Sequence, residues 1–236
     1  MAGLVRNPQE LLDQLRRLVT PPAPTGRDEP TSVDRILDAA HEAFSASGIR
    51  ATTMTRIARD AGVSREWLYR QFANRDAIVV AVAQREVTRF IDGLAVRAFG
   101  ADDLDSAMIE TFVYSVEFLR DHELLQRVLH TEADVLTGRV LLEGAPTLGV
   151  AVQAGAGYLS ALGDLRHDEA VTIAEVLVRL VATITFAPTS VLDLHDADQL
   201  RRFAATVVPG VIASARTAAP LEPPKARRRT SARTTP

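Results

Sequence analysis

The sequence predicts an all-α protein, on three observations. Between the two terminal segments, apolar residues recur three and four positions apart, which is the period of a helix with one buried face. No sustained alternation of apolar and polar residues marks a strand, and no Asn-Gly or Asp-Gly pair joins two such runs. Gly48 and Gly62 stop helical stretches, and Pro146, Pro188 and Pro209 constrain the ends or kinks of later ones.

Composition narrows the class further. The 236 residues allow one larger or two smaller domains, and 47% hydrophobic with 24% charged residues is the balance of a soluble globular protein. The absence of cysteine excludes disulfides, thiol catalysis and cysteine-ligated metals. No secretory signal and no run of about 18 apolar residues is found. We therefore expect a cytoplasmic protein with no membrane partner.

The leader, residues 1–30, predicts one short helix and a linker. Leucines at helical spacing give residues 8–19 an amphipathic pattern. The segment "TPPAPTGRDEP" follows with four prolines and one glycine, which favour a linker.

Residues 31–76 predict a small domain of three helices. A first helix fits residues 32–47, with Gly48 as its stop. Thr52 or Thr53 can cap a second, short helix, which Gly62 closes because the turn requires a residue that accepts positive φ. Ser64 caps the third helix.

The second domain, residues 77–215, is also predicted to be helical. Asn74 caps a long fourth helix that runs from about Arg75 towards Phe99. Five later helices are predicted near residues 103–120, 122–136, 147–162, 167–187 and 196–215. Residues 216–236 are expected to be disordered, and their "KARRR" cluster either contacts nucleic acid nonspecifically or keeps the chain soluble.

Charge is distributed unevenly although the formal net charge is only -3. Between Asp102 and Asp198, the sequence contains seventeen carboxylates but only five basic residues. Solvated faces of either sign are one explanation, and two separate functions are the other. Arginines recur in the first domain at positions Arg35, Arg50, Arg56, Arg59, Arg65, Arg70 and Arg75.

Two helices joined by a tight glycine turn form a helix-turn-helix, whose second helix can enter the major groove of DNA. In "SREWLYRQF", Leu68 and Phe72 lie four residues apart on one face and anchor that second helix. Arg65, Glu66, Tyr69 and Arg70 are left on the other faces.

The segment "RILDAAHEAFSASGIRATTMTRIARDAGVSREWLYRQFANRDAIVVAV" resembles the N-terminal domain of TetR-family transcriptional regulators. The resemblance covers residues 32 to about 85. It rests on the Phe44–Gly48 spacing, Thr53, Ile57-Ala58, "AGVS", "LY" and Phe72 ahead of a capped helix. It implies an N-terminal DNA-binding domain and a C-terminal helical domain for ligand binding and dimerisation.

The resemblance also implies roles for single residues. Thr53, Ser64, Tyr69 and Arg75 would contact phosphates of double-stranded DNA. Arginine can bind guanine bidentately and glutamate can accept from cytosine N4. The residues that would line the groove are Arg65, Glu66, Trp67 and Arg70.

Two of these positions depart from the family pattern, which commonly has a small residue at Glu66 and a threonine at Trp67. About 100° of helix separates Trp67 from the inward Leu68. Trp67 therefore either reaches the DNA from the edge of the inserted face or packs against the fourth helix.

The C-terminal domain is expected to form a homodimer. The stretch "EAVTIAEVLVRLVATITF" is apolar nearly all round and must be buried on more than one side. Within the family resemblance, helices 167–187 and 196–215 would pair with their copies in a four-helix interface, and the dimer would bind a palindromic operator. An ordinary core without a partner is the alternative.

A hydrophobic small-molecule effector is expected between the central helices, because such pockets are mostly apolar with few polar groups. Arg179 either pairs with Glu175 four residues earlier, which we favour, or binds an acidic head group. The candidate lining residues are Phe112, Val116, Leu119, Gln153, Tyr158, Arg179, Thr183 and Phe186.

No catalytic, cofactor or metal site is predicted. "HELL" at residue 122 is not a zinc-binding HExxH motif, and "DLHDAD" lacks the glycine and terminal glutamate of a calcium loop, so that Asp196 more simply caps a helix. The five histidines lie far apart in the sequence. The main hypothesis is a ligand-released repressor. Its rivals are a ligand-independent regulator or activator whose C-terminal domain only dimerises, a hydrolase, and a helical module that binds RNA or an acidic protein.

Overall fold

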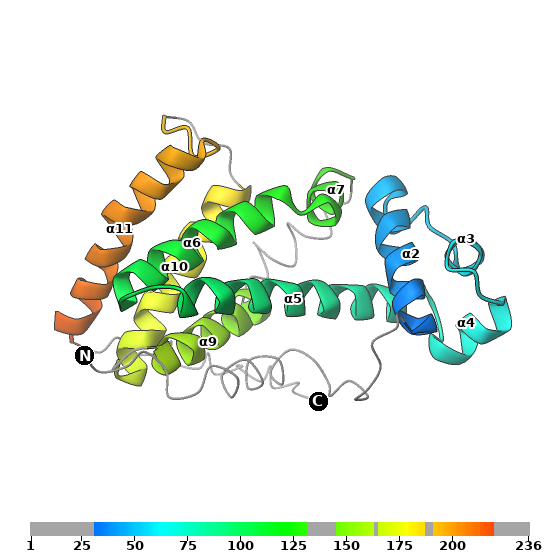
Figure 1. Ribbon diagram of the computed structural model, residues 1–236, viewed down its shortest axis with the longest axis horizontal. Coiled ribbons are helices and arrows are strands. Elements are labelled where there is room, and N and C mark those ends of the chain that lie inside the picture. Colours follow the sequence, from blue (N-terminus) through cyan, green and yellow to red (C-terminus); the bar gives the residue numbers. More distant parts are fainter. Residues whose placement is uncertain (1–30, 132–144, 163–164, 187–190, 220–236) are drawn as a thin grey trace, which may run out of the picture.

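The structure is a computed structural model that describes residues 31–131, 145–162, 165–186 and 191–219. Within these ranges the regular structure is α-helix, and no strand is present. Figure 1 shows α2, α3 and α4 at one end of the long axis, while α6, α9, α10 and α11 lie at the other. The long helix α5 joins the two groups, so the predicted all-α class and its division into a small and a large helical part are confirmed.

The small N-terminal domain contains α2 (Ser32–Ser47), α3 (Met54–Asp60) and α4 (Arg65–Gln71). The Thr31 hydroxyl accepts from the Asp34 amide while the Asp34 carboxylate accepts from the Thr31 amide, so two unpaired donors of the first turn are satisfied. The core of the domain is a cluster of fully buried side chains that includes Ile36, Phe44, Ile57 and Leu68.

Helix α5 (Arg75–Phe99) belongs to two hydrophobic cores. Ile78 and Val82 are buried in the core of the N-terminal domain, whereas Ile91 and Ala98 are buried in the core of the C-terminal domain. The positions of both domains are therefore set along one rigid element.

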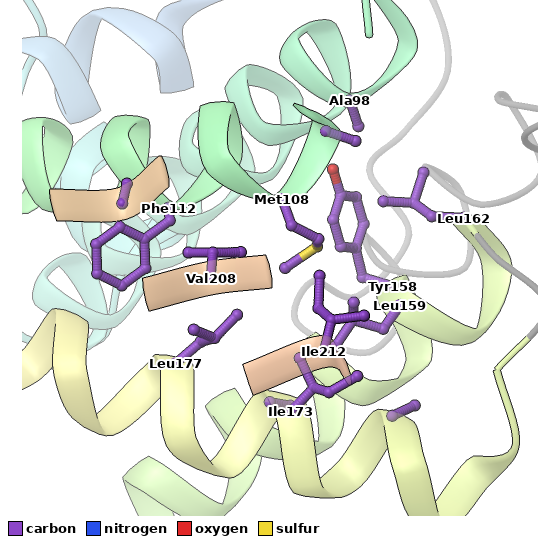
Figure 2. Close-up of a cluster of buried hydrophobic side chains, with 14 of the residues drawn as sticks. Ala98, Met108, Phe112, Tyr158, Leu159, Leu162, Ile173, Leu177, Val208 and Ile212 are labelled. Atoms are coloured by element: carbon purple, nitrogen blue, oxygen red, sulfur yellow. The ribbon is translucent and has the colours of Figure 1, made fainter. Parts of the chain in front are cut away.

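The C-terminal domain contains α6 (Leu104–Asp121), α7 (Glu123–Thr131), α9 (Ala145–Leu162), α10 (His167–Phe186) and α11 (Ala197–Thr217). Helix α6 packs against α5, α10 and α11, and α9 packs on α10. Figure 2 shows the resulting core, in which Met108, Phe112, Leu159, Ile173 and Val208 converge from four helices. Their burial supplies the hydrophobic stabilisation of this domain.

Most predicted helix bounds agree with the structure within two residues, and the Asp196 side chain accepts from the Gln199 amide at 2.8 Å as the predicted cap of α11. Pro209 neither ends nor begins that helix: it lies inside α11, which continues to Thr217. The predicted leader helix, the linker, Pro188, most of the basic tail and the end of the helix predicted for 122–136 lie outside the described residues. No helix in the described ranges has the length and apolarity needed to cross a membrane.

The two domains also meet through polar contacts beside α5. The Arg85 guanidinium donates to the Asp38 carboxylate at 2.6 Å and to the Leu37 carbonyl at 3.0 Å. Arg127 of α7 donates through Nε to the Ser45 carbonyl at 3.1 Å, near the end of α2. These contacts hold α5 and α7 against the side of α2, and Figure 1 shows α7 next to α2.

Helices α5 and α6 approach closely at Gly93. The Tyr114 ring of α6 stacks with Phe90 at a centroid distance of 5.7 Å and lies 3.8 Å from the Arg97 guanidinium carbon. A Cβ atom at Gly93 would lie 1.9 Å from the Tyr114 hydroxyl oxygen. Glycine at this position is therefore required by the packing.

We predict that Gly93→Ala lowers the free energy of unfolding. Alanine gains about 1 kcal/mol of helix propensity, but overpacking costs about 1–3 kcal/mol, and displacing Tyr114 also removes its aromatic and cationic contacts. Urea unfolding of the full chain measures the change. The control is Gly157→Ala in α9, where an added Cβ meets nothing within 4 Å and propensity should stabilise the helix by up to about 1 kcal/mol. Equal gains in the two variants would show that the Gly93 contact is unimportant.

Candidate nucleic-acid interface

The turn between α3 and α4 is built on one glycine. Ala61 ends α3, and Gly62 follows with φ of 65°, in the left-handed region. The Gly62 amide donates to the Arg59 carbonyl at 3.1 Å and the Val63 amide to the Ala58 carbonyl at 2.9 Å. These hydrogen bonds satisfy the last carbonyls of α3 and turn the chain sharply into α4.

Helix α4 begins at the predicted cap. The Ser64 side chain accepts from the Trp67 amide at 3.1 Å, and Glu66 places a negative charge in the first turn. Leu68 is fully buried, and Phe72 packs partly buried against the same core. This anchor fixes which side of α4 faces away from the protein.

The outward side of α4 consists of exposed side chains. Tyr69 is 47% exposed, which is high for an aromatic side chain. It does not help to anchor α4 in the core. In the part of the chain that the structure describes, no hydrogen bond or ion pair engages Arg65 or Arg70. The helix presents Arg65, Glu66, Tyr69 and Arg70 to solvent.

Trp67 lies at the border of this surface. Its side chain is half-buried and packs against the core formed by α2, α3, α4 and α5. Part of the Trp67 side chain therefore contacts the core, and the rest is open to solvent.

Two threonines position the start of α3. Thr53 is exposed, and its hydroxyl accepts from the Arg56 amide at 3.2 Å as the helix cap. Thr52 is buried and donates to the Gly48 carbonyl at 2.9 Å and, at 3.2 Å, to the Ala43 carbonyl. Thr52 therefore ties the loop to the end of α2, a role that a local sequence pattern does not distinguish from capping.

Arg75 is held by the protein backbone. Its Nη1 donates to the Arg50 carbonyl at 2.9 Å and to the Thr52 carbonyl at 3.4 Å. The contact joins the first turn of α5 to the loop before α3. The guanidinium that sequence analysis assigned to a DNA phosphate thus already has two acceptors.

Nearby arginines of α3 are partly neutralised. Arg56 and Arg59 both reach the Asp60 carboxylate, at 3.4 and 2.8 Å, and Arg56 also donates to the Ser47 hydroxyl at 2.7 Å. The hydrogen bond from Arg59 lowers the pKa of Asp60. Arg56 and Arg59 of α3 are therefore less available to an anion than Arg65 and Arg70 of α4.

The eight candidate ligand residues differ in their burial. Phe112, Val116 and Tyr158 are buried in the core, and the Tyr158 hydroxyl donates to the Leu94 carbonyl at 3.2 Å. Leu119 and Phe186 are half-buried. The remaining residues are exposed, namely Gln153, Arg179 and Thr183. Arg179 pairs with Glu175, with Nη2 2.5 Å from the carboxylate, which is the arrangement that the sequence favoured.

An open cleft of about 290 Å³ lies elsewhere, between α5 and the C-terminal half of α6. Tyr114 and Phe118 supply its aromatic surface, with ring centroids 5.6 Å apart. None of the eight candidates lines it. Its other lining residues are Arg97, Glu117, Asp121 and His122.

His122 also belongs to a cluster that the sequence analysis missed. Its Nε2 lies 3.3 Å from a Glu86 carboxylate oxygen, and His41 Nε2 lies 4.0 Å from the other. Burial lowers the pKa of His41. For Glu86, burial acts to raise the pKa, but the hydrogen bond from His122 and the charge of Arg89 outweigh it, so the pKa is lowered.

Comparison with known proteins agrees with this geometry. The family model for bacterial regulatory proteins of the tetR family matches residues 36–82. The chain is 28% identical over 181 residues to the HTH-type transcriptional regulator Rv1255c of Mycobacterium tuberculosis, covering 75% of this chain and 84% of the relative. It is 29% identical over 168 residues to Rv2250c of the same organism, covering 67% and 82%.

Solved structures share the fold. The TetR-family repressor AlkX from Dietzia sp. strain DQ12-45-1b superposes with a TM-score of 0.56 at 20% identity, covering 81% of this chain and 98% of that one. A TetR-family regulator from Streptomyces coelicolor A3 gives a TM-score of 0.51 at 18% identity, with coverages of 80% and 99%.

A glycine turn, a capped second helix and an outward polar face define a helix-turn-helix DNA-binding protein. The match of residues 36–82 to the tetR-family model, the relatives named as HTH-type transcriptional regulators and the shared fold together support a TetR-family transcriptional regulator.

We predict that Gly62→Ala destabilises the protein by about 1–2 kcal/mol, the cost of placing an L-residue in the left-handed region. No steric clash contributes, because an added Cβ meets nothing within 4 Å. Gly100→Ala is the matched control, since Gly100 has φ of -84° and should gain about 0.4–1 kcal/mol. Urea unfolding of both variants gives the comparison, and a neutral Gly62→Ala would contradict a strained turn.

Proposed function

We propose that this regulator is a repressor that binds a palindromic operator as a homodimer and releases it when a hydrophobic small molecule binds. The observation that supports DNA reading most directly is the exposed side of α4, where two arginines without a partner in the described chain flank Tyr69. A helix carrying such donors fits the major groove, where base edges present distinct acceptors.

The candidate DNA-binding residues fall into two groups, according to whether their side chains suit phosphates or base edges. The hydroxyls of Thr53, Ser64 and Tyr69 are suited to phosphates, which position the protein without reading sequence. Arg65 and Arg70 can donate bidentately to guanine, and Glu66 can accept from cytosine N4. Trp67 would contact a sugar or a thymine methyl with the part of its ring that reaches solvent.

A dimer is supported by the surface of the last two helices. TetR-family regulators bind DNA and typically dimerise. Val176 of α10 is 38% exposed, and Arg179 and Thr183 continue the same helical spacing. The exposed positions of α11 include the small residues Ala205, Thr206, Gly210 and Ala213. Small side chains allow two helices to approach closely.

The effector is proposed to occupy the cleft beside α6. Tyr114 and Phe118 offer aromatic surface for an apolar body, while Arg97 and Glu117 provide polar groups at the rim. His122 lines the same cleft and contacts Glu86 of α5. A ligand that binds better when these contacts change would shift the population of DNA-binding states.

Selection of duplexes from a random library by the full chain tests the DNA-binding part. A palindrome with half-sites about one helical turn apart is expected. Enrichment of a single half-site would exclude the symmetric dimer, and no enrichment would exclude sequence reading. Titrating hydrophobic compounds against the selected operator tests release, and unchanged affinity with a bound compound would favour the ligand-independent alternative.

Tyr69→Phe and Arg70→Ala are predicted to have different effects on operator binding. Tyr69→Phe removes a phosphate donor and should weaken all operator variants by a similar factor. Arg70→Ala should cost about 1–3 kcal/mol and relax preference at one base position. Fluorescence anisotropy on a panel of single-base operator variants measures both. Arg201→Ala, which removes an exposed arginine paired with Glu110 of α6, is the control for loss of charge. A uniform loss for Arg70→Ala would reassign Arg70 to a phosphate.

Arg75→Ala is predicted to weaken operator binding without the salt signature of a phosphate contact. Its guanidinium supports the loop before α3, so the loss should be similar at all sequences while the slope of log affinity against log salt stays near that of wild type. For comparison, loss of a charge that neutralises a phosphate would reduce the slope by about 1. A slope reduced by a full unit in Arg75→Ala would instead indicate a direct contact between Arg75 and a DNA phosphate.

A further inference from the structure

Two helices and the junction between two others contribute one potential metal ligand each where the two domains meet. His41 lies on α2, Glu86 on α5 and His122 between α6 and α7. One donor atom from each lies within 4.8 Å of the others. The Glu86 and His122 side chains are 12% exposed and that of His41 is 24% exposed, so the cluster is shielded but reachable from solvent.

The donor set has definite chemistry. Two imidazoles and one carboxylate suit borderline divalent cations, and the same set with a water in the fourth position is a recurrent zinc arrangement. We propose that His41, Glu86 and His122 form a binding site for a divalent transition metal, represented by Zn²⁺. The site itself does not rest on the proposed repressor function.

Two neighbouring arginines lower the affinity of the proposed site for a divalent metal. Arg89 Nη1 lies 3.0 Å from Glu86 Oε1, and Arg85 Nε lies 3.7 Å from the same oxygen. Arg85 is also held by Asp38, whereas Arg89 is half-exposed and free to turn into solvent. A bound cation must therefore displace Arg89 from Glu86, which weakens the site relative to an uncontested carboxylate.

His122 must also change partners. Its Nδ1 accepts from the Leu125 amide at 3.2 Å, which places the neutral ring's proton on Nε2, facing Glu86. Coordination by Nε2 requires that proton on Nδ1 instead, and the Leu125 amide then loses its acceptor. Metal binding is accordingly coupled to the first turn of α7, the helix whose Arg127 contacts the end of α2.

The three ligands span both domains, so a bound metal would fix α2 relative to α5 and the α6–α7 junction. The orientation of α4 follows that of α2 through their shared core. We expect Zn²⁺ to change operator affinity in the wild-type chain and to leave it unchanged in a variant that lacks the ligands.

Zn²⁺ binding is measured on the full metal-free chain by competition with a chromogenic chelator, without DNA. One Zn²⁺ per chain is expected. His41→Ala, Glu86→Gln and His122→Ala should each weaken binding by more than about tenfold, because loss of even an outer-shell partner of a metal costs about 10–100-fold. His167→Ala, at the exposed start of α10, should leave binding unchanged.

Arg89→Ala makes the test independent of damage to the fold, since it removes the nearer of the two competing cations and should tighten Zn²⁺ binding. Circular dichroism of the metal-free variants confirms folding. Binding that is insensitive to all four cluster substitutions, or that His167→Ala reduces as much as His122→Ala, would overturn the site. Zn²⁺ binding with unchanged operator affinity would retain the site and reject its coupling to DNA.

Discussion

The fold depends on one helix being shared between two hydrophobic cores. Ile78 and Val82 bury one end of α5 among α2, α3 and α4, and Ile91 and Ala98 bury the other end among α6, α9, α10 and α11. A 25-residue helix is stiff on the scale of these domains. A displacement at either end of α5 is therefore transmitted to the other core and not absorbed by a flexible linker.

The segment of α5 between the two cores is polar, and its side chains contact both domains. Arg85, Glu86 and Arg89 occupy the segment, and their partners come from α2 and from the α6–α7 junction. Of these pairs, the one between the half-exposed Arg89 and Glu86 contributes little net stability. The packed cores thus provide rigidity, while the polar segment joins α5 to α2 and to the α6–α7 junction.

Sequence reasoning succeeded where the determinant is local. Ser64, Asn74 and Asp196 each accept from an amide three residues on, and this spacing is readable from the chain alone. The outward face of α4 followed from the inward pair Leu68 and Phe72 by helical periodicity. Contacts between residues that meet across the fold cannot be read from the sequence in this way. Periodicity identifies the buried side of a helix but not the helix it faces, so the ligand candidates fell partly in the core and partly in solvent. Likewise, His41 and His122 meet only because α7 folds back onto α2.

Because of the same tertiary contact, a ligand in the cleft and a metal ion at Glu86 would both affect the His122 side chain. His122 lines the cleft, and its Nε2 also contacts Glu86. The Phe118 ring packs against the His122 ring, with the two ring centroids 5.4 Å apart. A ligand that moves Phe118 and a cation that captures Glu86 would both act on this imidazole. Because each displaces the ring from the arrangement that supports the first turn of α7, they cannot act independently. Their linkage is reciprocal, so an effector that disfavours metal binding must itself bind less tightly when the metal is present.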